Sequence, residues 1–235
     1  MDSAERLRLI GERAAAEVAE GMTVGLGTAS TAEAMIRALG ARVATGLKMT
    51  GVSTSDRTTA FATELNIPLI ALNNVERMEL CIDGADEIDP EANVVKGRGG
   101  ALLFEKLVAR QADRYVIIAS SEKLVPRLGV RLPLPVEIVP VGWKYTSSLV
   151  AELGLTPVLR TTASDEPYVT DGGHYILDCT PLSDGFADPR GIADRLKLIV
   201  GVIEHGLFIG MADLALTIDN DGIVTETVGI GAPNA

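Results

Sequence analysis

Hydrophobic residues recur along the chain with two periods, one typical of helices and one typical of strands. Apolar side chains from Leu7 to Val18 recur at helical spacing, which predicts an amphipathic helix over residues 4–19 that Gly21 ends. Short apolar runs then alternate with further helical patterns. The predicted strands cover residues 23–26, 48–53, 67–72, 80–82 and 115–119, and the predicted helices cover residues 31–39, 56–65 and 101–110. This alternation predicts an α/β fold in which helices cover both faces of a mostly parallel sheet.

The pattern changes near Gly129, where prolines cluster. Helices are predicted over residues 143–153 and 189–199, and strand-like pieces at 158–159, 168–169, 175–177 and 202–204. The pattern indicates a small α+β unit. Two strands at 212–218 and 223–228 flank a turn and are expected to return to the first sheet. We therefore predict a larger domain of residues 1–130 plus 206–235 and a smaller one of residues 131–205.

Composition limits the class of protein. The chain has 235 residues, of which 47% are hydrophobic, and a net charge of −11 from 21 Lys and Arg against 32 Asp and Glu. A general nucleic-acid binder usually shows a basic stripe, so nucleic acid is not an expected partner. Cys81 and Cys179 lie in separate apolar runs, as buried free thiols do in a reducing cytosol. With neither a signal-peptide core nor an apolar run of ~18 residues, we expect a cytoplasmic protein without a membrane segment.

The segment from Cys81 to Lys106 gathers most of the candidate chemistry. Asp83 and Asp86 follow a short apolar strand, at the strand end where α/β sheets bind ligands. Lys96 then leads a glycine-rich loop, which opens a helix that carries Glu105. These acids, this ammonium group and this flexible backbone suit proton transfer on a small anionic substrate.

The loop GLGTAST at residues 25–31 follows a strand and opens a helix. Backbone amides at the helix N-terminus, together with the hydroxyls of Thr28, Ser30 and Thr31, would cradle a phosphate group. The pattern is neither GxGxxG nor a P-loop, so it favours a small phosphate ester over a nucleotide. An ordinary capped turn is the alternative.

Each of these groups has an ordinary alternative. The acids of DGADEID at residues 83–89 could form a solvated turn or a metal site, although the spacing is not that of an EF-hand and no histidine is near. Glu105 shares a helix face with Ala101 and Ala109. Partial burial there would raise its pKa toward the range of a general base, but on this residue alone the pattern favours an ordinary exposed glutamate beside Lys106. Lys96 and Arg98 could instead be surface cations, and Lys123 is a further cation just past a strand end.

Taken together, the motifs resemble those of the ribose-5-phosphate isomerase A family. The matching pieces are GLGTAST at 25–31, DGADEID at 83–89, KGRGGALLFEK at 96–106, SEKLV at 121–125, PLPVEIVP at 133–140 and GLFIGMAD at 206–213. The resemblance implies a Rossmann-like α/β domain with a smaller ferredoxin-like α+β domain, in a homodimer or homotetramer. It implies interconversion of D-ribose 5-phosphate and D-ribulose 5-phosphate in the non-oxidative pentose phosphate pathway, with no cofactor and no metal.

The resemblance also implies roles for individual residues. Glu105 falls on the proton acceptor, which would move a proton between C2 and C1, and Lys96 would stabilise the enediolate. Asp83, favoured over Asp86, would relay the hydroxyl proton. The substrate-binding positions are Thr28, Ala29, Ser30, Thr31, Gly84, Ala85, Gly97, Arg98, Gly99 and Lys123. Whether Lys123 or the hydroxyl loop holds the phosphate stays open.

Three positions depart from the family pattern. Ala29 and Arg98 stand where glycine is usual, and an N-terminal lysine is absent, so that Arg6 or Arg8 would have to substitute for it. Three other functions remain as alternatives: a sugar-phosphate sensor of similar fold, an amino-sugar-phosphate deaminase-like enzyme, and a relative of the CoA-transferases.

Overall fold

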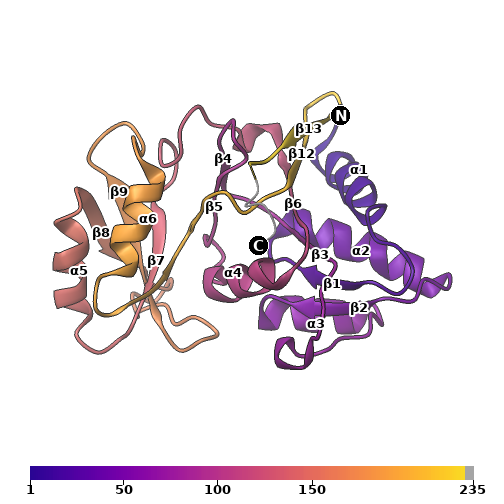
Figure 1. The fold of residues 1–235 in the computed structure, drawn as a ribbon, viewed down its shortest axis with the longest axis horizontal. Helices are drawn as coiled ribbons and strands as arrows, with labels where there is room; N and C mark the ends of the chain where they lie inside the picture. Colours follow the sequence, from indigo (N-terminus) through magenta and orange to yellow (C-terminus); the bar gives the residue numbers. More distant parts are fainter. Residues whose placement is uncertain (231–235) are drawn as a thin grey trace.

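The larger part of the molecule is built on a six-stranded sheet (Figure 1). The computed structural model describes residues 1–230. The strands are β1 (Thr23–Leu26), β2 (Thr50–Ser53), β3 (Leu80–Asp83), β6 (Tyr115–Ser120), β12 (Leu214–Ile218) and β13 (Val224–Val228). They run in the order β13-β12-β6-β3-β1-β2, and all neighbours are parallel except β12 and β13. The return of the last two strands to the first sheet is thus confirmed.

Helices cover both faces of this sheet. The helices are α1 (Ser3–Ala15), α2 (Ser30–Ala44), α3 (Asp56–Glu64) and α4 (Leu102–Gln111). Strand β6 shows why two layers are needed, because Val116 and Ile118 join the core beneath α1 and α2. The alternate residues Tyr115 and Ile117 join the core beneath α4, where Val108 packs. Two apolar faces with period 2 require cover on both sides.

A second sheet contains four antiparallel strands in the order β10-β7-β9-β8. Its elements are β7 (Leu134–Ile138), α5 (Trp143–Ala151), β8 (Leu155–Leu159), β9 (Tyr175–Pro181), α6 (Pro189–Lys197) and β10 (Val202–His205). This β-α-β-β-α-β order is that of a ferredoxin-like unit, so the predicted fold class is confirmed. All six elements lie within residues 131–205, although the domain division itself stays a prediction.

A three-stranded sheet connects the two larger sheets. It contains β4 (Glu87–Ile88), β5 (Val94–Val95) and β11 (Leu207–Phe208) in the order β11-β5-β4. The buried carboxylate of Glu87 accepts backbone N–H bonds from Gly129, Arg131 and Leu132, which fixes the chain as it enters the second sheet. In Figure 1, α4 lies below this small sheet, between the second sheet and the main one.

Several predicted elements were wrong. Residues 67–72 form only a single bridge, between Leu69 and Gly51, followed by the 3-10 helix η1 (Leu72–Asn74), and Pro68 lacks the N–H that a longer ladder needs. Residues 168–169 are also not a strand. The first helix was predicted to extend to residue 19, but it ends at Ala15. Val18 is still buried, although it lies in the turn after the helix. β4, β5, β7 and β11 were not predicted.

Other expectations can be compared directly with the structure. Cys81 and Cys179 are buried free thiols, as predicted. Within residues 1–230, no helix is long and apolar enough to cross a bilayer.

Candidate active site

The first two candidate loops meet at one edge of the main sheet. The parallel strands follow the order β2-β1-β3-β6-β12, so the chain reverses direction across the sheet between β1 and β3. In open α/β sheets, ligands bind beyond the strand ends at such a switch point. Here the N–H of Thr28 donates to Asp83 Oδ1 at 3.0 Å. Gly27 permits this contact, because a Cβ at that position would lie 2.1 Å from the same oxygen.

A buried cation lies between two carboxylates at this edge. Lys96 Nζ is 3.0 Å from Asp83 Oδ2 and 3.4 Å from Glu105 Oε1, and it donates to the carbonyl of Gly84 at 2.5 Å. The three charged residues are between 0% and 4% exposed. Buried charges are stable only when paired, so each of these three groups depends on the other two. The structure thus brings together three of the four predicted catalytic residues.

Two separate elements bring Lys96 and Glu105 together. Lys96 directly follows β5, and its backbone N–H donates to the carbonyl of Gly206 at 2.9 Å. Glu105 lies in the first turn of α4, on the buried face that also contains Val108 and Ala109. The predicted helix face for Glu105 is confirmed, and its alternative as an exposed glutamate is wrong.

Burial and charge change the proton affinities of all three groups. Burial raises the pKa of Glu105 to about 8, with Lys96 opposing the rise and Asp83 adding to it. Burial also raises the pKa of Asp83, against the opposing effects of Lys96 and two backbone N–H groups. Burial alone would lower the pKa of Lys96, but the two carboxylates outweigh it and the pKa is raised. Glu105 Oε2 is buried and has no hydrogen-bond partner within residues 1–230.

The glycine-rich loop closes over the same place. The N–H of Arg98 donates to Asp86 Oδ2 at 3.0 Å, so Asp86 contacts this loop and not Lys96. A Cβ at Gly99 would lie 3.9 Å from Thr28 Cγ2, which places this loop beside the first one. Arg98 is exposed.

The remaining small residues at this edge play different parts. A Cβ at Gly84 would lie 3.6 Å from the Ala29 methyl group, so the turns after β1 and β3 touch. Ala85 packs against the apolar core. Ala29 has φ 134° and ψ 171°, a backbone conformation that is essentially reserved for glycine and costs of order 1–3 kcal/mol.

Thr28 contributes differently from the expectation. Its hydroxyl is buried and lies 2.9 Å from Thr54 Oγ1, 2.8 Å from Ser55 Oγ and 3.0 Å from Thr58 Oγ1. These contacts fix the loop against the start of α3. The Thr28 hydroxyl is therefore not free to contact a phosphate group, although the sequence had suggested that it would be. Thr28 reaches the site through its backbone N–H.

The other hydroxyls of the loop line a separate cavity of about 150 Å³. Its polar lining residues are Ser3, Arg6, Ser30, Thr31, Ser120, Glu122 and Lys123. The first turn of α2, which begins at Ser30, has no side-chain cap, so its backbone N–H groups are open to a ligand. Lys123 and the hydroxyl loop thus belong to the same cavity.

Of the two candidate arginines, only Arg6 reaches this cavity. Arg6 is held near Asn220 and Glu122, and its Nε is buried without a partner within residues 1–230. Arg8 pairs with Glu5 and Glu12 on the exposed face of α1. Four residues of α1 line the cavity, beginning at Ser3, and they follow the helical spacing i, i+3, i+4 and i+7. This spacing could have shown from the sequence that Arg6 and Ser3 lie on the same helix face.

The acidic turn does not gather its carboxylates around one point. Asp83 faces Lys96, Asp86 faces the backbone of Arg98, and Asp89 accepts bonds from Asn93. Among residues 1–230, no group of three or more His, Cys, Asp or Glu side chains is placed to hold a metal ion.

The amino-acid sequence is similar to those of known proteins over most of its length. The family model of ribose 5-phosphate isomerase A (phosphoriboisomerase A) matches residues 50–222. Ribose-5-phosphate isomerase A from Synechococcus sp. (strain JA-3-3Ab) is 50% identical over 228 residues, which are 96% of this chain and 98% of the relative. The protein of the same name from Roseiflexus castenholzii is 48% identical over 226 residues, covering 95% of this chain and 96% of the relative.

Solved structures agree with these relatives. A D-ribose-5-phosphate isomerase in complex with phospho-erythronic acid has a TM-score of 0.93 and 32% identity, and the match covers 97% of this chain and all of that one (100%). Ribose 5-phosphate isomerase from Plasmodium falciparum has a TM-score of 0.91 and 33% identity, with 95% and 98% coverage.

The raised pKa of Glu105 predicts how stability depends on pH. Between about pH 4.5 and about pH 8, the folded state keeps a proton that Glu105 has already released in the unfolded chain, so Glu105 makes the free energy of unfolding fall as pH rises. The Glu105→Gln variant lacks this term. Its stability relative to wild type should grow across that window, by at most about 1.4 kcal/mol per pH unit, and level off above it. Urea unfolding of both proteins across the window measures the difference, and a flat or falling difference would contradict the assignment.

Proposed function

The chain belongs to the ribose 5-phosphate isomerase A family, and we propose that it interconverts D-ribose 5-phosphate and D-ribulose 5-phosphate through an enediolate. The observation that carries this proposal is the buried arrangement of Asp83, Lys96 and Glu105 at the switch point of the sheet. A base, a fixed cation and a second carboxyl group are the parts that an aldose–ketose isomerisation needs.

Glu105 is the proposed base. Its Oε2 takes the proton from C2 of the open-chain aldose and returns it to C1 of the enediolate, which gives the ketose. A pKa of about 8 suits both steps, because a base near the working pH can accept a proton and release it again. The cycle leaves Glu105 in the state in which it began.

Lys96 and Asp83 handle the oxygen atoms. As the C2 proton leaves, negative charge develops on the carbonyl oxygen at C1, and the Lys96 ammonium would stabilise it in this water-poor site. The proton on O2 must move to O1, and Asp83 is the proposed relay because it lies 3.0 Å from Lys96 while its raised pKa lets it carry a proton. These steps move only protons and charge, so we expect no cofactor and no metal.

The cavity beside α2 is the proposed phosphate site. It offers the side chains of Arg6 and Lys123, the hydroxyls of Ser30 and Thr31, and the open N-terminus of α2. Cations and a helix N-terminus are both favourable to a phosphate dianion. Ala29 joins this cavity to the Asp83 turn, so one extended sugar phosphate would span the two sites.

The family also suggests a setting for this activity. We expect a homodimer or homotetramer that works in the cytoplasm, in the non-oxidative pentose phosphate pathway. Size-exclusion chromatography with light scattering would measure the assembly.

The proposed activity predicts that the purified protein converts ribose 5-phosphate to ribulose 5-phosphate without added metal. A coupled assay measures the rate, with arabinose 5-phosphate as a competitor and treatment with a chelator as a control. No conversion, together with release of ammonia from glucosamine 6-phosphate, would favour the deaminase alternative. Binding of ribose 5-phosphate with no turnover would favour the sensor.

The phosphate site predicts opposite outcomes for two neighbouring arginines. Arg6→Gln should raise KM for ribose 5-phosphate by ~10-fold or more, because it removes a charged contact to phosphate worth ~1.5–3 kcal/mol. Arg8→Gln, on the exposed face of the same helix, should leave KM unchanged. Steady-state kinetics of both variants make the comparison, and equal KM values would remove Arg6 from the site.

A further inference from the structure

Arg160 joins the second sheet to the glycine-rich loop of the site. It lies one residue beyond β8, and its side chain is 15% exposed. Its Nη1 donates to the carbonyl of Gly97 at 3.0 Å and to the carbonyl of Arg98 at 3.1 Å. A residue far along the chain therefore holds two successive carbonyls of the loop that follows Lys96.

Asp178 fixes the orientation of this guanidinium group. On β9, Asp178 lies opposite Val158 of β8 and accepts from Arg160 Nε at 2.9 Å and also from Nη2. One edge of the guanidinium thus binds the carboxylate while the remaining nitrogen faces the loop. A lysine could not make both sets of bonds, because its single ammonium lacks the planar fork.

The peptide groups of the loop pass this constraint to the site. In a trans peptide the C=O and N–H of one unit point in opposite directions. With the carbonyl of Gly97 on Arg160, the N–H of Arg98 points away from Arg160 and meets Asp86 Oδ2 at 3.0 Å. With the carbonyl of Arg98 on Arg160, the N–H of Gly99 also points away, and it has no acceptor within residues 1–230.

Few other contacts hold the middle of this loop. Its start is tied by the N–H of Lys96 to Gly206, and its end by the N–H of Gly100 to Gly97. Gly97 has φ 103°, so the backbone there has the freedom of glycine, and the Arg98 side chain is exposed. The Tyr168 hydroxyl donates to the carbonyl of Gly99 at 3.4 Å, a longer contact than those of Arg160.

We propose that Arg160, oriented by Asp178, is a positioning residue for the isomerisation. It holds the loop so that Asp86 is tied to the N–H of Arg98 while the N–H of Gly99 is presented to the enediolate oxygens of the substrate. This inference rests on the proposed function and adds to it the group that aligns the loop donors. The role proposed for Arg160 is to position this loop and not to contact the substrate.

The test compares Arg160→Lys with wild type in the ribose 5-phosphate assay. We expect kcat to fall by up to ~100-fold, the loss that a displacement of about 1 Å in the reacting geometry can cause, with KM within a few-fold of wild type. Binding of phospho-erythronic acid should weaken, whereas binding of inorganic phosphate should not change, because the phosphate cavity lies elsewhere. The melting temperature should stay close to that of wild type.

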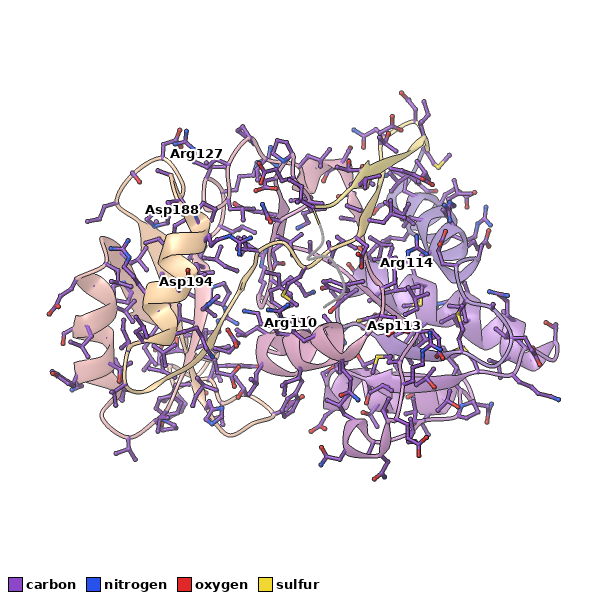
Figure 2. The ribbon with its side chains drawn as sticks, viewed as in Figure 1. Arg110, Asp113, Arg114, Arg127, Asp188 and Asp194 are labelled. Atoms are coloured by element: carbon purple, nitrogen blue, oxygen red, sulfur yellow. The ribbon has the colours of Figure 1, made fainter. Side chains whose placement is uncertain are left out.

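Two further variants keep the test sharp. Asp178→Asn retains the arginine but loosens its orientation, so it should lower kcat in the same direction, and the double variant should be no worse than Arg160→Lys alone. Arg127→Lys is the matched control, because Arg127 also donates to a carbonyl, that of Asp184. In Figure 2, Arg127 lies well apart from α4, which Arg110 marks, and its kcat should equal that of wild type.

The outcomes separate this inference from the proposed function. A wild-type protein that does not isomerise ribose 5-phosphate would overturn the proposed function. An active wild type with unchanged kcat in Arg160→Lys and Asp178→Asn would overturn the positioning role alone. A lower kcat accompanied by weaker phosphate binding and a lower melting temperature would also overturn the positioning role, because these changes together would show general damage to the fold.

Discussion

The site depends on one buried ammonium group that serves two buried carboxylates. Lys96 lies within 3.4 Å of both Asp83 and Glu105, and none of the three reaches solvent to any useful extent. Two carboxylates buried together would repel each other and lose their hydration, and removing the shared cation from such a site typically costs ~3–5 kcal/mol. The strand end, the small sheet and the start of α4 all converge on this one contact.

The same contact explains why the two carboxyl groups can differ in role. Asp83 accepts two backbone N–H bonds on Oδ1, from Thr28 and Gly84, which oppose the effect of burial. Glu105 has one oxygen near Lys96 and one without a partner in the described part of the chain. Its proton is therefore held mainly by burial, and a pKa of about 8 leaves it able to accept and release that proton. The proposed phosphate site is separate, in the cavity beside α2.

The sequence predicted the site best where the residues that carry the chemistry lie close together along the chain. Asp83, Lys96 and Glu105 lie within one short segment, so chain order already places them near one another. The small sheet, through the bond from Lys96 to Gly206, then fixes Lys96 between the two carboxylates. The alternating α/β pattern likewise predicted the main sheet, because buried parallel strands are short apolar runs separated by helices. Residues 67–72 misled for the same reason, since an apolar run beside Pro68 looks like a strand but cannot sustain a ladder.

The predictions that were wrong, and the features that were missed, depend on contacts between residues far apart in the sequence. The Thr28 hydroxyl looked available to a phosphate, but three hydroxyls from the segment before and within α3 bury it. Arg160 had no motif to mark it, because its partners are backbone carbonyls more than 60 residues earlier. Strand β7 lies in a proline-rich stretch that argues against a strand, yet Pro135 is tolerated within it.

The most direct test of the central account is solvent exchange at the reacting carbons. Ribose 5-phosphate and ribulose 5-phosphate are held at equilibrium with the enzyme in D₂O and followed by NMR. If Glu105 moves a proton through an enediolate, deuterium should appear at C2 of the aldose and C1 of the ketose, and Glu105→Gln should slow this exchange ~10²- to 10⁴-fold. Isomerisation without any deuterium uptake, or wild-type exchange in the Glu105→Gln variant, would contradict it.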